Sequence, residues 1–376
     1  MRLFTILLMT LFISACGGSS SSGTDTTDTG ENTNSTDQTE NTNPSDTTDS
    51  TDQTDNTDTS DTTDSTDQTE ATDPTDTTDS TDQTKTTDPT DNGESSVDIT
   101  DIILTKRATN CSEYVKNYTS SVKDIKRALV FDGNLEIQVN NGKCSFDTNA
   151  IPNHDFNDDG ASFATDVSEN YSYFEVTQAP TKSASSTALS IQTDNAIFLN
   201  GVKLDLLAAG CFGVGDGRIG CGNMDAPFRY DPMSPTANFG TDSHNAHTQP
   251  DGTYHYHGNP NALFYSDAQV ISPVIGFAAD GFPIYGSYFD DNGTIRKATS
   301  SYQLKSGYRE GINGIYPEGN YDGTFVDDYQ YSVNSGDLDE CNGMTINGSY
   351  GYYVTDSYPW VLGCFSGMPD SSFNKR

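Results

Sequence analysis

The chain is poor in basic residues and has no apolar run long enough to cross a membrane. Its 376 residues include 19 Lys and Arg against 55 Asp and Glu, so the formal net charge is −36. This charge repels a polyanion, and we expect no nucleic-acid partner. The apolar run at residues 3–13 holds eleven residues, whereas a membrane-spanning helix needs about 20. The run is therefore typical of a secretory signal rather than of a transmembrane helix.

Several sequence signatures of catalysis are also missing. The chain contains no G-x-S-x-G nucleophile elbow and no G-x-x-x-x-G-K-[ST] phosphate loop. No two cysteines have the C-x-x-C spacing that is typical of many zinc sites. These absences restrict enzyme functions to metal-assisted chemistry or to general acid–base chemistry by His with Asp.

The N-terminus has the features of an exported lipoprotein. Arg2 supplies a positive charge before the apolar run, and residues 13–16, ISAC, resemble a lipobox, in which the cysteine is lipidated and the chain is cut before it. We therefore expect a signal peptide at residues 1–15 and a membrane anchor on Cys16. By resemblance to lipoproteins of Gram-negative bacteria, Gly17 favours the outer membrane, so the expected location is the cell envelope, with the domain periplasmic or surface-exposed. The alternative is an ordinary signal peptide cleaved at the same position.

Residues 16–98 form a low-complexity segment of Thr, Asp, Ser, Asn and Gln. The segment has no aromatic residue and one larger aliphatic residue, Val97, and it carries 22 acidic residues against Lys85 alone. Such a composition cannot bury enough apolar surface to offset the entropy of ordering the chain. We predict a disordered acidic tether, followed by one folded domain at residues 99–376.

Six cysteines fall in the predicted domain, and an even number in an exported protein predicts disulfides. Three bridges allow fifteen connectivities. Pairing between sequence neighbours joins 111 with 144, 211 with 221 and 341 with 364, and the bridge 211–221 is favoured because it would close a Gly-rich loop, CFGVGDGRIGC. The six residues are Cys111, Cys144, Cys211, Cys221, Cys341 and Cys364.

Short apolar or alternating runs, separated by Gly, Asn, Asp and Pro, predict that strands dominate the domain. One helix is expected over residues 111–129, where Tyr114, Tyr118 and Val122 belong to a pattern with spacings of three and four. Asn200-Gly201 is a signal for a hairpin turn. The expected fold class is mostly β (all-β or α+β), in a single disulfide-stabilised domain that is sandwich- or barrel-like. The expected strands lie at residues 135–140, 171–177, 196–207, 252–258, 274–280 and 350–355.

Four of the five histidines lie within fourteen residues, in the segment FGTDSHNAHTQPDGTYHYHGNP. Residues 250–252, Pro-Asp-Gly, predict a turn that leads into a strand. On that strand the period of two places His255 and His257 on one face, and the turn folds them towards His244 and His247. Convergent imidazoles suit a divalent transition metal, with Zn²⁺ or Cu²⁺ foremost and Ni²⁺ or Fe²⁺ also compatible. The alternative is a hydrogen-bonded structural cluster.

Carboxylates near the histidines suggest further ligands. Asp242 or Asp251 is a candidate oxygen ligand, or an acceptor for the ring N–H of a ligating histidine. Separately, the segment at residues 155–166 resembles a calcium loop, but its twelfth position is Asp rather than Glu and no flanking helices are expected. Ca²⁺ is therefore a weaker candidate than a transition metal. The candidate calcium ligands are Asp155, Asn157, Asp159 and Asp166.

The histidine segment resembles the YHYH-domain family, which is named for Tyr-His-Tyr-His, here residues 254–257. Other family-like segments lie at residues 226–232, 239–247, 276–286, 338–343 and 352–367, so the resemblance covers most of residues 100–367. A further family-like segment, IPNHD, brings in His154 as a fifth candidate ligand. The family carries no settled activity that the resemblance could imply.

Two positions within the family-like segments bear on the site. Asp280, in GFAADGFPIYG, is expected either to face the histidines or to form a structural turn. Family members often have a further histidine where this chain has Gly351. If that histidine is an essential ligand or base, this chain has lost part of the chemistry; if the site needs only the first cluster, nothing changes.

Three functions are compatible with these observations. The leading hypothesis is a membrane-anchored extracytoplasmic protein that binds a divalent transition metal through its histidine cluster. The first alternative is a metal-dependent hydrolase or oxidoreductase. The second is a non-catalytic adhesion or glycan-binding module, for which the Tyr and Phe residues and Trp360 offer stacking surfaces. The sequence identifies neither a substrate nor a protein partner.

Overall fold

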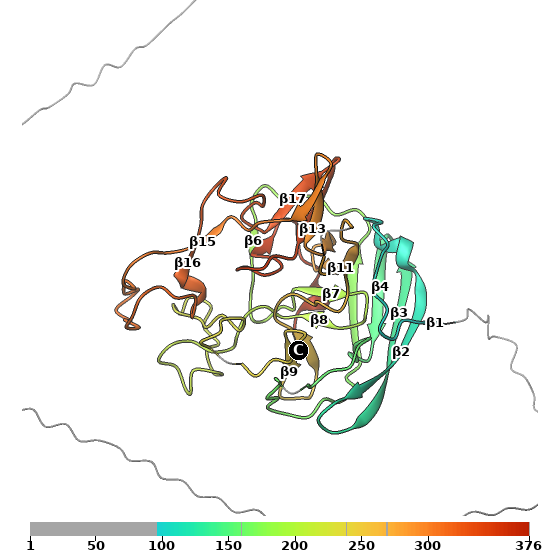
Figure 1. The fold of residues 1–376 in the computed structure, drawn as a ribbon, viewed down its shortest axis with the longest axis horizontal. Coiled ribbons are helices and arrows are strands. Elements are labelled where there is room, and N and C mark those ends of the chain that lie inside the picture. Colours follow the sequence, from blue (N-terminus) through green and yellow to red (C-terminus); the bar gives the residue numbers. More distant parts are fainter. Residues whose placement is uncertain (1–95, 159, 238, 268–269, 376) are drawn as a thin grey trace, which may run out of the picture. The chain divides into compact units, whose positions relative to one another are not determined.

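The computed structural model describes residues 96–158, 160–237, 239–267 and 270–375 (Figure 1). The predicted signal peptide, Cys16 and the tether up to residue 95 lie outside the described residues. Within the described part, no helix has the length and apolar character needed to cross a bilayer.

A five-stranded sheet forms the N-terminal part of the domain, in the order β1-β2-β3-β4-β5. Its first two strands run parallel and the others antiparallel. Burial alternates along β3, where Gly133, Leu135 and Ile137 are buried and their neighbours are exposed. One face of the sheet therefore packs inward. The strands are β1 (Val97–Asp98), β2 (Lys116–Asp124), β3 (Leu129–Asn140), β4 (Lys143–Thr148) and β5 (Ser172–Thr177).

The helix expected over residues 111–129 is wrong. A 3-10 helix, η1 (Cys111–Tyr114), is followed by β2, which pairs with β3 along its whole length. Val122 follows Tyr118 by four positions, an even number, so a strand also places the two side chains on one face. The Thr-Ser-Ser run between them has a low helix propensity, and the pairing with β3 stabilises a strand instead.

An eight-stranded mixed sheet forms the centre of the domain, in the order β17-β18-β12-β11-β7-β8-β10-β9. The sheet brings together segments that lie about 150 residues apart in the chain (Figure 1). The strands are β7 (Ala196–Phe198), β8 (Lys203–Leu204), β9 (Ala246–Thr248), β10 (Tyr254–Tyr256), β11 (Val274–Ala278), β12 (Pro283–Tyr285), β17 (Gly343–Ile346) and β18 (Ser349–Tyr353).

The two sheets pack on a common core. Phe146 of β4 meets Phe277 of β11, with ring centroids 6.2 Å apart, and Tyr114 packs edge-on against the same ring at 5.7 Å. All three side chains are buried in one hydrophobic cluster. The fold is mostly β, as the sequence predicts, and its two main sheets are arranged as in a sandwich.

Smaller elements complete the described part of the chain. Three two-stranded sheets and two further 3-10 helices lie between or after the strands of the main sheets in the chain. They are β6 (Thr187–Ala188) with β19 (Cys364–Phe365), β13 (Tyr288–Asp291) with β14 (Thr294–Lys297), β15 (Tyr302–Leu304) with β16 (Tyr329–Tyr331), η2 (Val326–Asp328) and η3 (Ser371–Phe373).

The predicted hairpin at Asn200-Gly201 is confirmed. The N–H of Phe198 donates to the carbonyl of Val202 and closes the turn between β7 and β8. Gly201 has a φ of +83°, and a Cβ at this position would lie 2.5 Å from the Oγ1 of Thr148. Both the backbone conformation and the close approach of β4 therefore require glycine.

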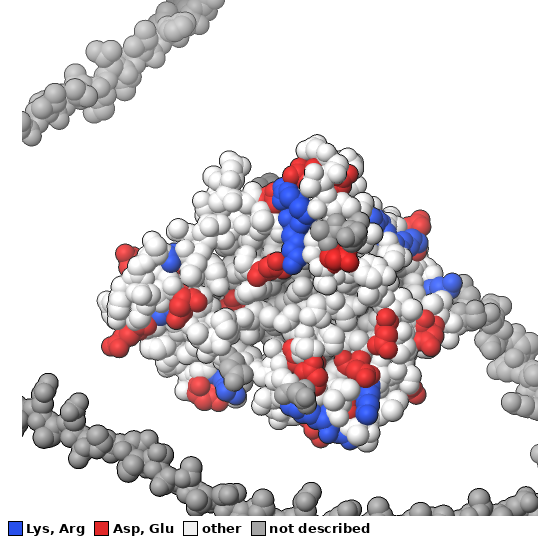
Figure 2. All heavy atoms as spheres, viewed as in Figure 1, with Lys and Arg blue, Asp and Glu red and all other residues white. Residues whose placement is uncertain are grey.

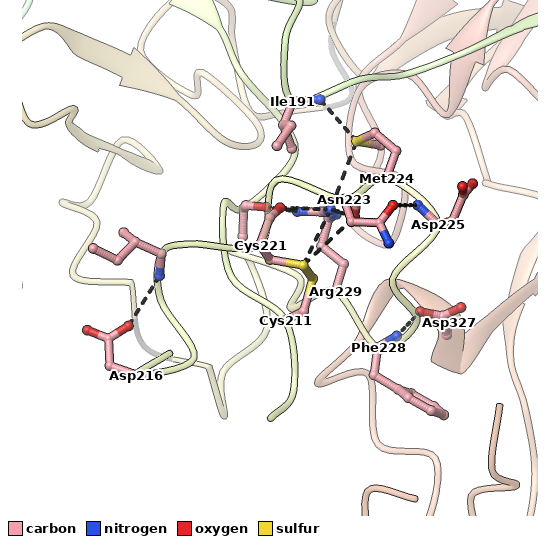
Figure 3. The surroundings of a disulfide bond; sticks show 12 residues. Ile191, Cys211, Asp216, Cys221, Asn223, Met224, Asp225, Phe228, Arg229 and Asp327 are labelled. Atoms are coloured by element: carbon pink, nitrogen blue, oxygen red, sulfur yellow. Dashed lines mark hydrogen bonds between the residues drawn. A yellow bond between two sulfur atoms is a disulfide. The ribbon is translucent and has the colours of Figure 1, made fainter. Parts of the chain in front are cut away.

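The three disulfides join sequence neighbours, as expected: Cys111–Cys144, Cys211–Cys221 and Cys341–Cys364. Figure 3 shows the second of these beside Arg229. The buried guanidinium of Arg229 donates to the carbonyls of Ala208, Cys221 and Asn223, so bridge and arginine together fix the Gly-rich loop. On the surface, basic side chains mostly lie beside acidic ones (Figure 2), and several form ion pairs.

Candidate metal centre

The pairing of β9 with β10 brings three histidines together. His247 lies directly opposite His255 in the antiparallel register. His257 follows β10 and lies two residues after His255, so its side chain points to the same face. The turn between the strands is closed by the N–H of Gly252, which donates to the carbonyl of Gln249. The Pro-Asp-Gly turn of the sequence therefore sets the register of the site.

The three rings converge through their Nε2 atoms. The Nε2 of His257 lies 3.0 Å from that of His255 and 2.9 Å from that of His247. Ring centroids are 4.7–4.8 Å apart, and the potential ligand atoms of all three residues lie within 4.8 Å of one another. We call His247, His255 and His257 the three-histidine group.

Backbone carbonyls orient two of the rings. The Nδ1 of His247 lies 2.7 Å from the carbonyl oxygen of Phe239, and the Nδ1 of His255 lies 3.3 Å from that of Thr253. A carbonyl can only accept, so these contacts assign the proton to Nδ1 and leave the Nε2 lone pair facing the other rings. Such an outer hydrogen bond is the usual support of a metal-ligating histidine. The Nδ1 of His257 is buried and has no hydrogen-bond partner among the described residues. The nearby backbone of Asp205 and Leu206 acts to raise the pKa of this ring, but less than burial lowers it.

Burial keeps all three imidazoles neutral. It lowers the pKa of His247, and it lowers the pKa of His255 and His257 well below the usual value of 6.5. Mutual repulsion between the rings adds to this effect on the pKa of His255 and His257, and the charges of Lys203 and Lys375 act in the same direction. Neutral imidazole is the form that binds metals.

The donor set fits a divalent transition metal. Two neutral Nε2 lone pairs at 2.9–3.0 Å repel each other unless a proton or a cation lies between them. A proton on the Nε2 of His257 can be directed at only one of its two neighbours. A first-row ion held at about 2.0–2.1 Å places its ligand nitrogens about 3–3.4 Å apart, so small ring movements suffice.

The group opens onto a large cavity. The cavity has a volume of about 930 Å³, and all three histidines line it. No Cys, Asp or Glu of the described residues completes a fourth protein ligand beside the three imidazoles. Three protein ligands next to open space is the arrangement of catalytic rather than structural zinc sites.

The tyrosines of the same strand serve the opposite face. Tyr254 and Tyr256 are fully buried. The hydroxyl of Tyr254 donates to Asp242 at 2.8 Å, and that of Tyr256 donates to the Nε2 of His154 at 2.5 Å while it accepts from the amide of Asn200 at 3.0 Å. The alternation of the motif thus separates candidate ligands from residues that fix the strand.

His244 and His154 are not brought to the three-histidine group. They contact each other, with ring centroids 3.9 Å apart, and the Nδ1 of His244 lies 2.9 Å from the Oδ1 of Asn261. Burial and the neighbouring ring of His244 lower the pKa of His154 to about 3. The carboxylate of Asp242 accepts the backbone N–H of His244 and so fixes a turn before β9. This turn directs His244 away from His247, so the expected convergence of all four histidines is wrong for His244.

The nearby carboxylates have structural partners. Asp242 accepts from Tyr254 and from three backbone N–H groups, and Asp251 accepts from the N–H of Thr253 in the turn. Of the two, only Asp251 lines the cavity. Asp280 accepts from the hydroxyl of Tyr352 and the N–H of Gly367, and it is not among the described residues that line the cavity. Of the two expectations for Asp280, the structure therefore supports the structural turn and not a position facing the histidines.

The segment that resembles a calcium loop does not present a cluster of free ligands among its described residues. Asp155 accepts the N–H of Lys123, and the amide of Asn157 donates to Asp124. Asp166 is exposed and forms an ion pair with Arg127 at 3.3 Å. Asp159 lies outside the described residues.

Gly351 and Trp360 belong to the packing of the domain. A Cβ at Gly351 would lie 2.5 Å from the ring of Tyr285, so this position in β18 has no room for a side chain. Trp360 packs against the core and donates its indole N–H to the buried carboxylate of Asp231. Its ring is therefore not a free stacking surface.

The sequence interpretation missed the charged residues beside the group. Lys203 and Asp205 are buried and line the same cavity as the histidines. The sequence did contain a signal for them, because Lys203 and Asp205 are the two charged residues in the otherwise apolar run 202–207, VKLDLL. Lys375 also lines the cavity, but it is separated from the histidine segment by more than 100 residues and carries no signal of its own.

Comparison with known proteins places the site in a family. The family model described as YHYH protein matches residues 173–367, which include the three-histidine group, His244 and Asp280. Neither the curated proteins nor the solved structures contain a match to this chain. The match covers more than half of the 376 residues and includes the strand from which the motif takes its name, so the chain belongs to the YHYH protein family.

Proposed function

We propose that the domain binds a divalent transition metal through the Nε2 atoms of His247, His255 and His257. The observation that carries this proposal is the convergence of three neutral rings at 2.9–3.0 Å, two of them oriented by carbonyls on Nδ1. Zn²⁺ and Cu²⁺ are the first candidates, because imidazole suits both ions. The structural cluster is the competing explanation, and it leaves the close Nε2 contacts of His257 only partly satisfied.

A metal-dependent hydrolase or oxidoreductase is the second candidate function. It is favoured by the cavity beside the histidines, and because three protein ligands would leave a coordination position of the ion free for water or substrate. A bound ion in such a site would supply Lewis-acid or, for copper, redox chemistry. The chain itself holds the imidazoles in place through the carbonyls of Phe239 and Thr253, and the cavity gives access to a small molecule.

Metal content tests the proposal directly. The full chain is stripped with a chelator, incubated with Zn²⁺ or Cu²⁺, passed over a desalting column and measured by elemental analysis. We expect about one ion per chain and loss of that ion in His255→Ala. His244→Ala is the matched control, since His244 lies on the same segment but outside the group. Stoichiometry near zero in the unmodified chain, or equal loading of both variants, would reject metal binding here.

We also propose that the protein is a lipoprotein of the cell envelope, anchored through Cys16, with the domain periplasmic or surface-exposed. The short apolar run, the ISAC sequence and three disulfides support export to an oxidising compartment. Metabolic labelling with a palmitate analogue tests the anchor: the unmodified chain should incorporate label and Cys16→Ser should not. Equal labelling of both would contradict it.

A further inference from the structure

Five side chains form a closed polar ring on the wall of the cavity. The Nζ of Lys203 lies 3.1 Å from the Oδ2 of Asp194 and 3.0 Å from the Oε1 of Gln249. The amide of Gln249 donates to the Oδ2 of Asp205 at 3.0 Å, and the same oxygen accepts from the Nζ of Lys375. The Nζ of Lys375 lies 3.7 Å from the Oδ1 of Asp194, which closes the ring. We call these residues the charged ring.

The charged ring lies on the same face of the sheet as the three-histidine group. Lys203 of β8 is the register partner of His255 in β10, and partners on neighbouring strands point to one side. Gln249 follows His247 by two residues, which places it on that side as well. All five ring residues line the cavity together with the three histidines. A molecule bound at the histidines therefore lies beside the ring.

The ring offers hydrogen-bond donors to the cavity, whereas its spare acceptors are enclosed. An ammonium group has three N–H donors. In Lys203 two of them are used, by the Oδ2 of Asp194 and the Oε1 of Gln249. Lys375 donates to one carboxylate oxygen and is in looser contact with another. The Oδ1 atoms of Asp194 and Asp205 are buried and accept no hydrogen bond from the described residues. Each ammonium group thus has at least one N–H without a hydrogen-bond acceptor among the described residues, while the carboxylates fix the ammonium groups in place.

A third cation stands on the same cavity. Arg218 lies on the loop closed by Cys211–Cys221, is exposed, and lines the cavity. Within the described part of the chain its guanidinium donates no hydrogen bond. The exposed carboxylates of Asp147 and Asp251 also line the cavity. The charged ring holds two ammonium groups against two carboxylates and is neutral overall, so its contribution to anion binding is directed N–H groups rather than net charge, and Arg218 is the lining cation that forms no ion pair with the described residues.

We propose that the cavity binds an oxyanion, a carboxylate or phosphate group, held between the three-histidine group and the ammonium groups of Lys203 and Lys375, with Arg218 as a further donor. The inference rests on the proposed function for the contact to a bound metal ion, whereas the contacts to Lys203, Lys375 and Arg218 do not depend on the metal. Ammonium and guanidinium groups are the donors that bind carboxylate and phosphate most strongly. Lys375 lies outside residues 173–367, the part that matches the family model.

Calorimetric titration of the full chain with inorganic phosphate tests the proposal, in the metal-free and in the Zn²⁺-loaded form. We expect the loaded form to bind phosphate with a Kd of about 1 mM or tighter. Lys375→Met should weaken binding about tenfold or more, because one charge-assisted hydrogen bond is lost. Lys116→Met is the control, since Lys116 is exposed on β2 and does not line the cavity. Arg218→Met serves as a second variant on an exposed loop, in case Lys375→Met lowers the melting temperature.

The outcomes separate this inference from the metal proposal, because metal content is measured in the same samples. Full metal loading with no phosphate binding at about 10 mM overturns the anion site alone. Equal phosphate affinity in the unmodified chain, Lys375→Met and Arg218→Met also overturns it. Phosphate binding to a chain that takes up no metal, weakened by Lys375→Met, supports the anion site and rejects the metal. Absence of both rejects both.

Discussion

Removal of one hydroxyl group, in Tyr256→Phe, should destabilise the fold without emptying the candidate metal centre. Tyr256 is fully buried, and its hydroxyl both donates to His154 and accepts from Asn200. The substitution leaves these two buried polar groups without their partner, at about 1–3 kcal/mol for each unsatisfied group. Partial relaxation reduces the sum, and we expect a loss of about 2–4 kcal/mol in the free energy of unfolding.

Thermal unfolding of the metal-free chain measures this loss. For a domain of this size, 1 kcal/mol corresponds to about 2–4 °C, so the melting temperature should fall by about 5–15 °C. Tyr316→Phe is the matched control, because Tyr316 is 70% exposed and its substitution should change stability by less than about 0.5 kcal/mol. Metal stoichiometry should be unchanged in Tyr256→Phe, since the ring lies on the face opposite the three-histidine group. A melting temperature equal to that of the control, or loss of the metal with stability intact, would refute this assignment of the two faces.

Three further predictions concern pH, a disulfide and a turn. The pKa of His154 is about 3 in the folded chain and about 6.5 in the unfolded chain, so between these values only the unfolded state binds a proton at this ring. The melting temperature should therefore fall as the pH drops from about 6.5 towards 3, and an unchanged melting temperature would argue against a buried neutral ring. Replacement of Cys211 and Cys221 by Ala should lower the free energy of unfolding by about 2.7 kcal/mol, from a sequence separation of ten, in chemical denaturation. Gly201→Ala should cost about 1–3 kcal/mol, because φ is +83° and the new Cβ would meet Thr148; a neutral effect in the same assay would mean that the turn rearranges.

Local patterns predict the candidate site well where the backbone is regular. The period of two along residues 254–257 places His255 and His257 on one face, and the Pro-Asp-Gly turn predicts a return strand that carries His247. The same reasoning fails for His244, because the side chain of Asp242 caps a turn and no simple spacing describes such a conformation.

Long-range contacts explain what the sequence does not predict. β8 and β10 are parallel neighbours although about 50 residues separate them, and this pairing brings Lys203 beside His255. Lys375 reaches Asp205 across 170 residues. Tyr118 and Val122 fit a helix and a strand equally well, and only the pairing of β2 with β3 decides between them.

The division of the motif strand has a consequence for how variants of this protein will behave in a cell. Substitutions at Tyr254 or Tyr256 act on the interior and should be detected as lower protein abundance, since proteolysis follows the unfolded population. Under the proposed function, substitutions at His255 or His257 should be detected as loss of bound metal that exceeds any loss of abundance. We therefore expect two separable phenotypes to alternate along four consecutive residues, 254–257.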